Sequence, residues 1–241
     1  MDRESDERGA ARRVPRRRLG APRLALHCLI ALASGAAGAD WSGGVEGGTV
    51  VRDGGSATRL SVSLVEDGRP LTHALRADWL RYDEGSGYRA AYVPRYWLSE
   101  ALYLFGDLEA RRDRPFGIEA GYRGIVGGGY RVLDTATQGL GVELGLGGRH
   151  TEFELGGEES EGLALARAAY RLTLVDDLRF GLDAEILQGE TLGEVHAEAS
   201  LAYRVPGGGA IRLGYRVRRL SRDGAPTIED DAPSLSLTYG F

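Results

Sequence analysis

Ionisable side chains alternate with apolar ones in three consecutive stretches near the end of the chain, and these residues have the types and spacing that chemistry requires. They are Asp183, Glu185, Glu194, His196, Glu198, Arg216 and Arg218. Because successive side chains of a β-strand point to opposite faces, each stretch places its ionisable residues on one face and its apolar residues on the other. Such a face can support acid–base catalysis around the imidazole, or it can consist of ion pairs between carboxylates and guanidinium groups.

Catalysis at His196 would need a nucleophile within hydrogen-bond reach, and its own strand does not provide one. Ser200 lies further along the same face, and at ~3.3 Å per residue the two side chains are about 13 Å apart. The sequence contains no Gly-x-Ser-x-Gly and no His-Glu-x-x-His motif. A serine on a neighbouring strand is the remaining route to a hydrolase, which is our alternative hypothesis, and no catalytic residue is assigned.

The other interpretation is that these charges pair with one another. Antiparallel pairing of successive strands places Glu198 near Arg218 and Arg167 near Asp183. The acidic residues then form a patch near the outer mouth of the fold, opposite Arg218 and Arg216. This patch either neutralises the interior or acts as a weak electrostatic filter for small solutes.

The strands that would position this face recur along the whole chain after residue 40. Short runs of alternating hydrophobicity are separated by Gly, Asp, Pro and Ser, and they cover 41–51, 57–66, 71–82, 88–98, 101–111, 117–132, 138–153, 162–172, 177–187, 193–205, 210–220 and 232–241. Most have the length of ~9–11 residues that a tilted strand needs to cross a bilayer, and an even number of strands is typical of bacterial barrels. The pattern predicts an all-β fold, a single antiparallel up-and-down barrel of about twelve strands.

Periodicity alone does not decide whether the apolar face points into a soluble core or outward into lipid, but two other features favour lipid. The longest connections, 156–161 and 221–231, both follow odd-numbered strands, so they fall on one side of the barrel. Five tyrosines fall near the ends of even-numbered strands, on or close to the apolar face, as an aromatic belt requires. They are Tyr96, Tyr130, Tyr170, Tyr203 and Tyr239. We therefore expect a transmembrane barrel with both chain ends in the periplasm and charges lining its interior.

Acidic residues gather in those two long connections. They are Glu158, Glu159, Glu161, Glu229, Asp230 and Asp231. Oxygen-rich clusters suit Ca²⁺ or Mg²⁺, which would also bridge lipopolysaccharide. Solvated acidic loops are the commoner arrangement, so the sequence predicts no metal site and no cofactor.

The last strand carries a second signal. Leu235, Leu237, Tyr239 and Phe241 share one face and the chain ends on an aromatic residue. This pattern resembles the C-terminal signal by which Gram-negative bacteria mark outer-membrane barrels for assembly. It implies membrane lipid, lipopolysaccharide and the barrel assembly machinery as partners.

Residues 1–39 differ from the rest and are predicted to be a signal peptide. A group of arginines precedes the apolar run 24–33, which gives way to small residues that close on Ala37-Gly38-Ala39. The apolar run is shorter than the ~20 residues of a transmembrane helix. We expect cleavage before Asp40, which leaves an outer-membrane barrel of residues 40–241.

Composition excludes other classes. The single cysteine, Cys28, lies in the predicted leader, so no disulfide framework is expected in the barrel. The whole chain has a net charge of −5, and the leader contributes eight Arg against four acidic residues, so the barrel is more acidic than the whole. An acidic chain without basic clusters is not typical of nucleic-acid binding.

Four segments support a resemblance to a known family. They are Trp41-Ser-Gly-Gly-Val-Glu-Gly-Gly48, Gly127-Gly-Gly-Tyr-Arg131, Glu143-Leu-Gly-Leu-Gly147, and the Asp223-Gly and Asp230-Asp231 pairs before Ser236-Leu-Thr-Tyr-Gly-Phe241. In combination they resemble the salt-induced outer-membrane proteins, a domain family of unknown function, over residues 40–241. The first turn, Arg52-Asp53-Gly54-Gly55-Ser56, departs from the family pattern because it lacks Asn.

The resemblance implies an outer-membrane barrel without catalytic residues. It implies a passive envelope or narrow channel protein with a part in osmotic or salt adaptation and with small solutes or ions as its cargo. The alternative hypothesis is an outer-membrane hydrolase that acts on lipids at a lumenal or surface site.

Overall fold

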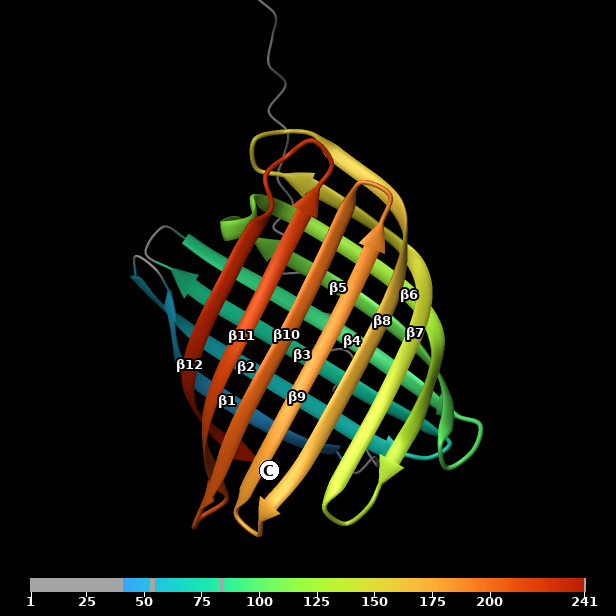
Figure 1. The fold of residues 1–241 in the computed structure, drawn as a ribbon, viewed down its shortest axis with the longest axis vertical. Helices are drawn as coiled ribbons and strands as arrows, with labels where there is room; N and C mark the ends of the chain where they lie inside the picture. Colours follow the sequence, from blue (N-terminus) through green and yellow to red (C-terminus); the bar gives the residue numbers. More distant parts are fainter. Residues whose placement is uncertain (1–40, 53–54, 83–84, 241) are drawn as a thin grey trace, which may run out of the picture. The chain divides into compact units, whose positions relative to one another are not determined.

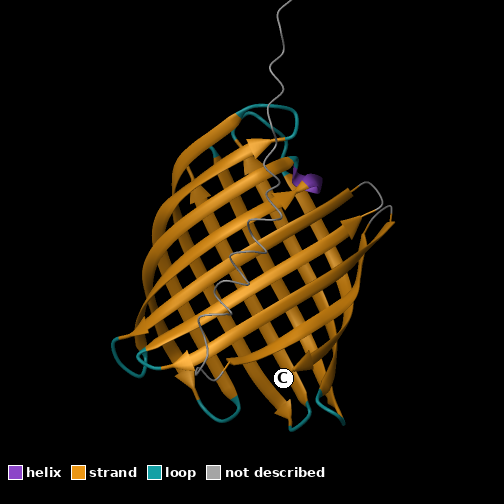
Figure 2. Ribbon diagram, turned by 180° about the vertical axis from the view of Figure 1, so that it is seen from behind, coloured by secondary structure: helices purple, strands orange, loops and turns teal. Residues whose placement is uncertain are grey.

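The described residues fold into a closed antiparallel barrel in which every strand pairs with its neighbours in sequence. The computed structural model describes residues 41–240 except 53–54 and 83–84, so the predicted leader and Phe241 lie outside the described residues. The strands are β1 (Trp41–Arg52), β2 (Gly55–Gly68), β3 (Leu71–Tyr82), β4 (Gly85–Trp97), β5 (Leu102–Asp113), β6 (Ile118–Asp134), β7 (Gln138–Phe153), β8 (Glu158–Val175), β9 (Leu178–Gly189), β10 (Leu192–Val205), β11 (Gly209–Arg222) and β12 (Ile228–Gly240). Pairing of β1 with β12 closes the barrel (Figures 1 and 2). The predicted all-β barrel of about twelve strands is confirmed within these residues.

The strands continue beyond the predicted turns. β8 already begins at Glu158, which pairs with Glu152, and β12 begins at Ile228, which pairs with Leu220. The predicted long connections 156–161 and 221–231 are therefore wrong in extent, because most of their acidic residues belong to strands. Two features hold the extended ends: Arg222 forms an ion pair with Glu159 and lies 4.3 Å from the ring centroid of Phe153.

One rim of the barrel carries the start of β1 and the end of β12, and we call it the first rim and the opposite one the second rim. Turns at the first rim are short, and the turn between β10 and β11 has φ of +95° at Gly207 and +86° at Gly208. Only glycine adopts this backbone region readily, so the two residues permit the tight reversal. At the second rim, β5 and β6 are joined by the short 3₁₀ helix η1 (Arg114–Phe116). Among the described residues, no helix has the length and hydropathy to cross a bilayer.

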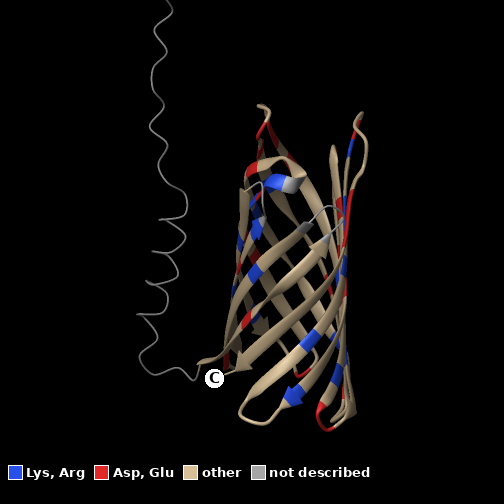
Figure 3. Cartoon of the chain, turned by 90° about the vertical axis from the view of Figure 1, so that its left-hand side faces the viewer, with Lys and Arg blue, Asp and Glu red and all other residues tan. Residues whose placement is uncertain are grey.

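The two faces of the wall have opposite character. Leu201 is 36% exposed and Leu213 is 55% exposed, whereas Glu198 is 8% exposed and Arg216 is 7% exposed. Since strand neighbours point to opposite faces, the leucines lie on the outside and the charged residues line the lumen. Figure 3 shows the charged residues spread along the strands of the wall. This orientation is the one a lipid-embedded barrel requires.

Aromatic residues mark both edges of the apolar outer surface. The five predicted belt tyrosines face outward near the first rim, with Tyr130 51% exposed and Tyr239 59% exposed. Trp79, Tyr88 and Tyr122 face outward nearer the second rim. From Tyr122 to Tyr130 the strand advances roughly 26 Å, or about 20 Å along the barrel axis at the usual tilt. This height is of the order of the apolar band of outer-membrane barrels.

Candidate functional site: the lumen

The charged residues predicted from β9, β10 and β11 all face the lumen, but their pairing differs from the prediction. Glu198 lies opposite Arg216, and Arg218 lies opposite His196. Arg167 lies opposite Glu185, whereas Asp183 lies opposite Ala169. The predicted Glu198–Arg218 and Arg167–Asp183 neighbours are therefore wrong in register.

Turn geometry explains both differences. The β10–β11 turn contains only Pro206, Gly207 and Gly208, because Val205 already pairs with Gly209. The β8–β9 turn contains only Asp176 and Asp177, because Val175 already pairs with Leu178, and a register shift between Thr173 and Val175 displaces by one residue every pair that lies farther from the turn. A one-residue irregularity in a turn or bulge changes which charges face each other across two strands.

The acidic residues do not form a patch at one mouth. Their register places Glu194, Glu185 and Asp183 at successive levels down the wall, because Glu194 lies opposite Leu187, the inward residue that follows Glu185 on β9. Each of the first two contacts arginines from the opposite wall. The predicted acidic patch is therefore replaced by separate cross-lumen contacts.

These contacts form a set that we call the ion-pair network. Its members are Arg89, Arg95, Arg111, Arg123, Arg149, Arg167, Asp107, Glu109, Glu143, Glu161, Glu185 and Glu194. They come from β4 through β10, and the cations and anions are equal in number. Equal numbers of opposite charges let an enclosed interior hold ionised groups without a net charge.

Arg167 and Arg123 are the most connected cations of the network, since each forms ion pairs with three carboxylates. The guanidinium of Arg167 lies 2.6 Å from Asp107, 2.8 Å from Glu143 and 2.5 Å from Glu185. Tyr103 donates a hydrogen bond to Glu143 at 3.0 Å. Carboxylates of three strands therefore converge on the Arg167 guanidinium, and charge-assisted bonds of this kind are stronger than those between neutral groups.

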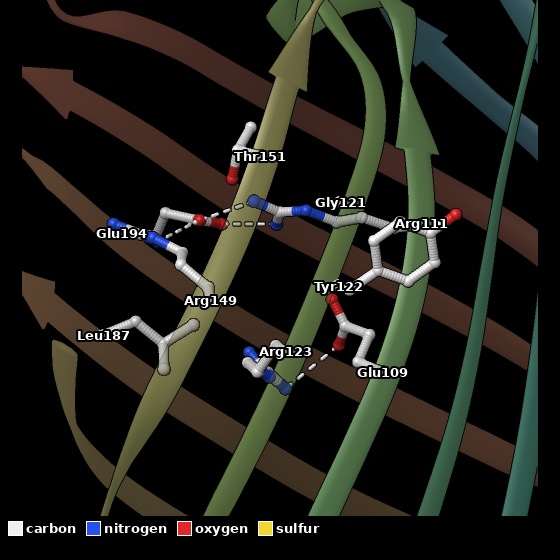
Figure 4. A pocket seen from close by; sticks show the side chains of 9 residues that line it. All are labelled: Glu109, Arg111, Gly121, Tyr122, Arg123, Arg149, Thr151, Leu187 and Glu194. Carbon is white, nitrogen blue, oxygen red and sulfur yellow. Dashed lines mark hydrogen bonds and ion pairs between the residues drawn. The ribbon is translucent and has the colours of Figure 1, made fainter. Parts of the chain in front are cut away.

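Glu194 is the corresponding anion nearer the second rim. Both nitrogens of the Arg111 fork donate to its two carboxylate oxygens at 2.6 Å, and Arg149 donates at 2.7 Å (Figure 4). Arg149 also donates to Glu161 and to the carbonyl of Leu192. The gap left among these side chains is about 10 Å³, which is roughly the space of one water molecule. This part of the lumen is filled.

The lumen also holds apolar side chains that the sequence pattern did not predict. They form a cluster of Tyr103, Phe105, Ile125, Leu163, Leu165 and Leu187, with Trp97 packed against it. Glycines on the facing strands make room for the rings: a Cβ on Gly129 would lie 2.3 Å from Tyr103, and one on Gly127 would lie 2.7 Å from Phe105. The sequence signal for this cluster was the set of lumenal glycines opposite large residues. Both faces of β5 are apolar at this level, so alternation of polar and apolar residues could not reveal the cluster.

A second apolar cluster spans the lumen at the second rim. Phe116 and Ile118 from the β5–β6 connection pack with Leu192 and Leu220 from β10 and β11. Arg218 lies 4.3 Å from the ring centroid of Phe116 and forms an ion pair with Asp113 at 2.5 Å. These contacts join opposite walls and narrow this opening.

An open cavity remains beside the filled part. It has a volume of about 1000 Å³ and is lined mainly by β2–β4 and β9–β11. Its lining extends from Phe116 and Leu220 at the second rim to Thr173 and Ala210 at the first rim. The lumen is thus divided lengthwise into a plugged side and an open side.

His196 lines this cavity without a catalytic partner. Its Nε2 is buried and makes no hydrogen bond, and the ring faces Arg218 and Glu185 across the two neighbouring strands. Ser200 faces Gly181 and Gly214 instead. Within the described part of the chain, no group of three or more His, Cys, Asp or Glu residues is arranged to hold a metal ion. The geometry therefore gives no support to a hydrolytic site at His196.

Comparison with known proteins identifies the family. Residues 61–241 match the sequence profile of a protein family of unknown function, DUF481. The chain belongs to this family. No curated protein matches the sequence. The resemblance inferred from the sequence, to a family of unknown function that forms outer-membrane barrels, is confirmed.

The DUF481 protein has the fold of outer-membrane porins and channels. Similar structures include the NanC porin, with a TM-score of 0.58 and 8% identity over 82% of this chain and 98% of that chain. The KdgM porin has a TM-score of 0.51 and 13% identity over 82% and 99%. An outer membrane channel from Pseudomonas putida F1 has a TM-score of 0.51 and 9% identity over 84% and 96%. At these identities the likeness concerns the fold alone.

Proposed function

We propose that this DUF481 protein is a narrow passive channel of the outer membrane for small solutes. The observation that carries the proposal is the cavity of about 1000 Å³ whose lining extends from one rim to the other. The neighbouring folds are porins and channels, which supports a channel rather than an enzyme. Because the ion-pair network fills the other side of the lumen, the pathway is narrower than that of a wide porin.

Planar bilayer recording tests this function directly. The refolded barrel should give discrete steps of small conductance in KCl. Ser200→Trp places an indole among the cavity-lining side chains and should lower the step size. Ala199→Trp, one residue away on the outward face, is the matched control and should leave the step size unchanged. Absence of steps from correctly folded protein at every voltage would overturn the proposal.

Export and assembly belong to the same proposal. Residues 1–39 act as a cleaved signal peptide, and the outward row Leu235, Leu237, Tyr239 and Phe241 is recognised by the barrel assembly machinery. The first rim then faces the periplasm, and lipopolysaccharide surrounds the second rim. Cell fractionation should recover the protein in the outer membrane, and replacing Leu237 and Tyr239 by Ser should reduce the folded amount there. Recovery in the soluble periplasmic fraction would contradict this.

The part in osmotic or salt adaptation that the resemblance implies is a physiological extension of the channel proposal. No side chain of the lumen bears on it. A deletion strain should grow more slowly than its parent at high salt and recover with the wild-type chain but not with Ser200→Trp. Equal growth of both strains would remove this part of the proposal and leave the channel itself untouched.

A further inference from the structure

The lumen near the first rim contains four arginines, and three of them form no ion pair with an acidic residue in the part of the chain that the structure describes. We call this region the basic chamber, and its members are Arg171, Arg179, Arg204 and Arg212 from β8, β9, β10 and β11. Arg212 forms ion pairs with Glu46 at 3.2 Å and with Glu198 at 2.8 Å. Among the described residues, no ion pair joins the other three to a carboxylate, and the acidic group that acts on Arg171 from a distance is Asp183.

Strand register shows that Arg171, Arg179 and Arg212 share one small region, and Arg204 is the next inward residue after Ala202 on β10. Ala202 lies opposite Arg179 on one side and opposite Arg212 on the other. Arg171 is opposite Gly181, and Arg179 is opposite the adjacent inward residue Thr173, so the two arginines are diagonal neighbours. Diagonal neighbours on one sheet face lie about 7–8 Å apart at the backbone, within reach of long side chains.

The residues between the arginines are small. Gly181 and Ala202 form the wall between Arg171, Arg179 and Arg212, and all five residues line the open cavity. The space in front of this wall is therefore available to a ligand. Arg171, Arg179 and Arg204 are also exposed, whereas the network arginine Arg123 is 8% exposed.

Unpaired cations in a partly enclosed lumen attract anions. Like charges repel one another, and apolar walls focus the field of the arginines into the cavity. The planar guanidinium fork matches the two oxygens of a carboxylate or the oxygens of a phosphate group. A bound anion would take the place that Glu143 and Glu185 occupy beside Arg167 in the ion-pair network.

We propose that the basic chamber binds small solutes that carry carboxylate or phosphate groups and makes the channel selective for anions. The selectivity rests on the proposed channel function, whereas the binding site does not. The chamber lies where the cavity approaches the first rim, so an anion in transit passes its arginines. Charged rings select ions in other pores by the same electrostatics.

Reversal potential in a KCl gradient is the first test. The wild-type barrel should favour Cl⁻ over K⁺, and the triple variant Arg171→Gln, Arg179→Gln, Arg204→Gln should lose this preference while it still conducts. The single variant Arg179→Gln has Arg81→Gln as its matched control, because Arg81 is exposed on the outward side of β3. Arg179→Gln should reduce the preference for Cl⁻ more than Arg81→Gln. Conductance without preference for anions in the wild type, or equal effects of the two single variants, would overturn the selectivity.

Direct binding is the second test and does not require conduction. Calorimetric titration of the folded barrel with citrate and with inorganic phosphate distinguishes carboxylate from phosphate ligands. The triple variant should bind the preferred anion roughly tenfold more weakly or not at all. If the wild-type barrel binds an anion and the triple variant does not, the binding site is supported even when no conductance is observed in bilayers. Binding without conductance would refute only the channel function. Absence of binding to the wild-type barrel by both anions overturns the site.

Discussion

Arg167 and Arg171 are on the same strand, face the same lumen and are separated by one inward residue, yet their surroundings differ completely. Arg167 contacts three carboxylates at 2.8 Å or less, whereas no ion pair joins Arg171 to a carboxylate among the described residues. The neighbours explain this contrast. Arg167 lies between Glu143 and Glu185 on the adjoining strands, and Arg171 lies between Gly139 and Gly181.

The contrast shows how one residue type serves two purposes in one barrel. In the ion-pair network each guanidinium is already coordinated, so it holds the walls together and offers nothing to a solute. At Arg171 in the basic chamber glycines replace the carboxylates on both adjoining strands, so this guanidinium is stabilised less and remains available. The cross-strand partner, rather than the arginine itself, decides between a structural and a binding role.

The largest effect should come from Arg167→Ala. Its removal leaves Asp107, Glu143 and Glu185 close together in the lumen without their shared cation, which should lower the free energy of unfolding by about 3–5 kcal/mol. The matched variant Arg171→Ala should change it by less than ~0.5 kcal/mol. Urea unfolding in phospholipid vesicles, followed by tryptophan fluorescence, measures both values. Equal losses would show that the two regions do not differ in structural importance.

The next effect extends the comparison to the other side of the same wall. Leu144 is the outward neighbour of the network residue Glu143 and is 68% exposed. Leu144→Arg should lower the free energy of unfolding by about 2–4 kcal/mol in vesicles, since it places a cation in lipid. Leu155→Arg is the control, because Leu155 is fully exposed in the β7–β8 turn, and it should be neutral. A neutral Leu144→Arg would contradict the lipid-facing orientation.

A smaller effect is expected from glycines that differ between the two regions. A Cβ on Gly129 would lie 2.3 Å from the ring of Tyr103, whose hydroxyl binds the network residue Glu143. Gly129→Ala should therefore cost about 1–3 kcal/mol of stability through overpacking. Gly139 pairs with Arg171 in the basic chamber and has no atom within 4 Å of its Cβ position, so Gly139→Ala should be tolerated. Chemical unfolding of both variants measures these changes. A larger loss of unfolding free energy for Gly139→Ala than for Gly129→Ala would refute this packing account.

Local alternation, together with the turn lengths and tyrosine positions that indicate lipid outside, was sufficient to predict the wall of this barrel. Leu201, Leu213, Glu198 and Arg216 lie on the faces that their positions in the sequence predict, because period two and a lipid surround leave no other arrangement. The strand number and the outward tyrosines follow from the same rule. Each of these features depends on a residue and its nearest neighbours in sequence.

The contents of the lumen could not be predicted in this way. Contacts such as Arg111 with Glu194 and Arg218 with Asp113 join strands on opposite walls, and their choice depends on tilt, bulges and barrel width together. The register shift near Thr173 alone changes the partner of Arg167. The basic chamber was missed for the same reason, since a lack of partners becomes visible only when every neighbour has been placed.

The smallest expected effect is a gain in stability. It comes from a substitution that gives the basic chamber a carboxylate like those of the ion-pair network. Ala202 faces the lumen between Arg179 and Arg212, so Ala202→Glu places a carboxylate opposite both guanidinium groups. Cross-strand pairs of opposite charge contribute about 0.2–1 kcal/mol, and we expect a gain in unfolding free energy of that order. The same carboxylate should compete with citrate and weaken its binding, whereas Ala202→Gln should change neither quantity by a comparable amount. If Ala202→Glu stabilised the barrel without weakening citrate binding, the anion would have to bind elsewhere, and the chamber would be an unfinished part of the ion-pair network instead of a ligand site.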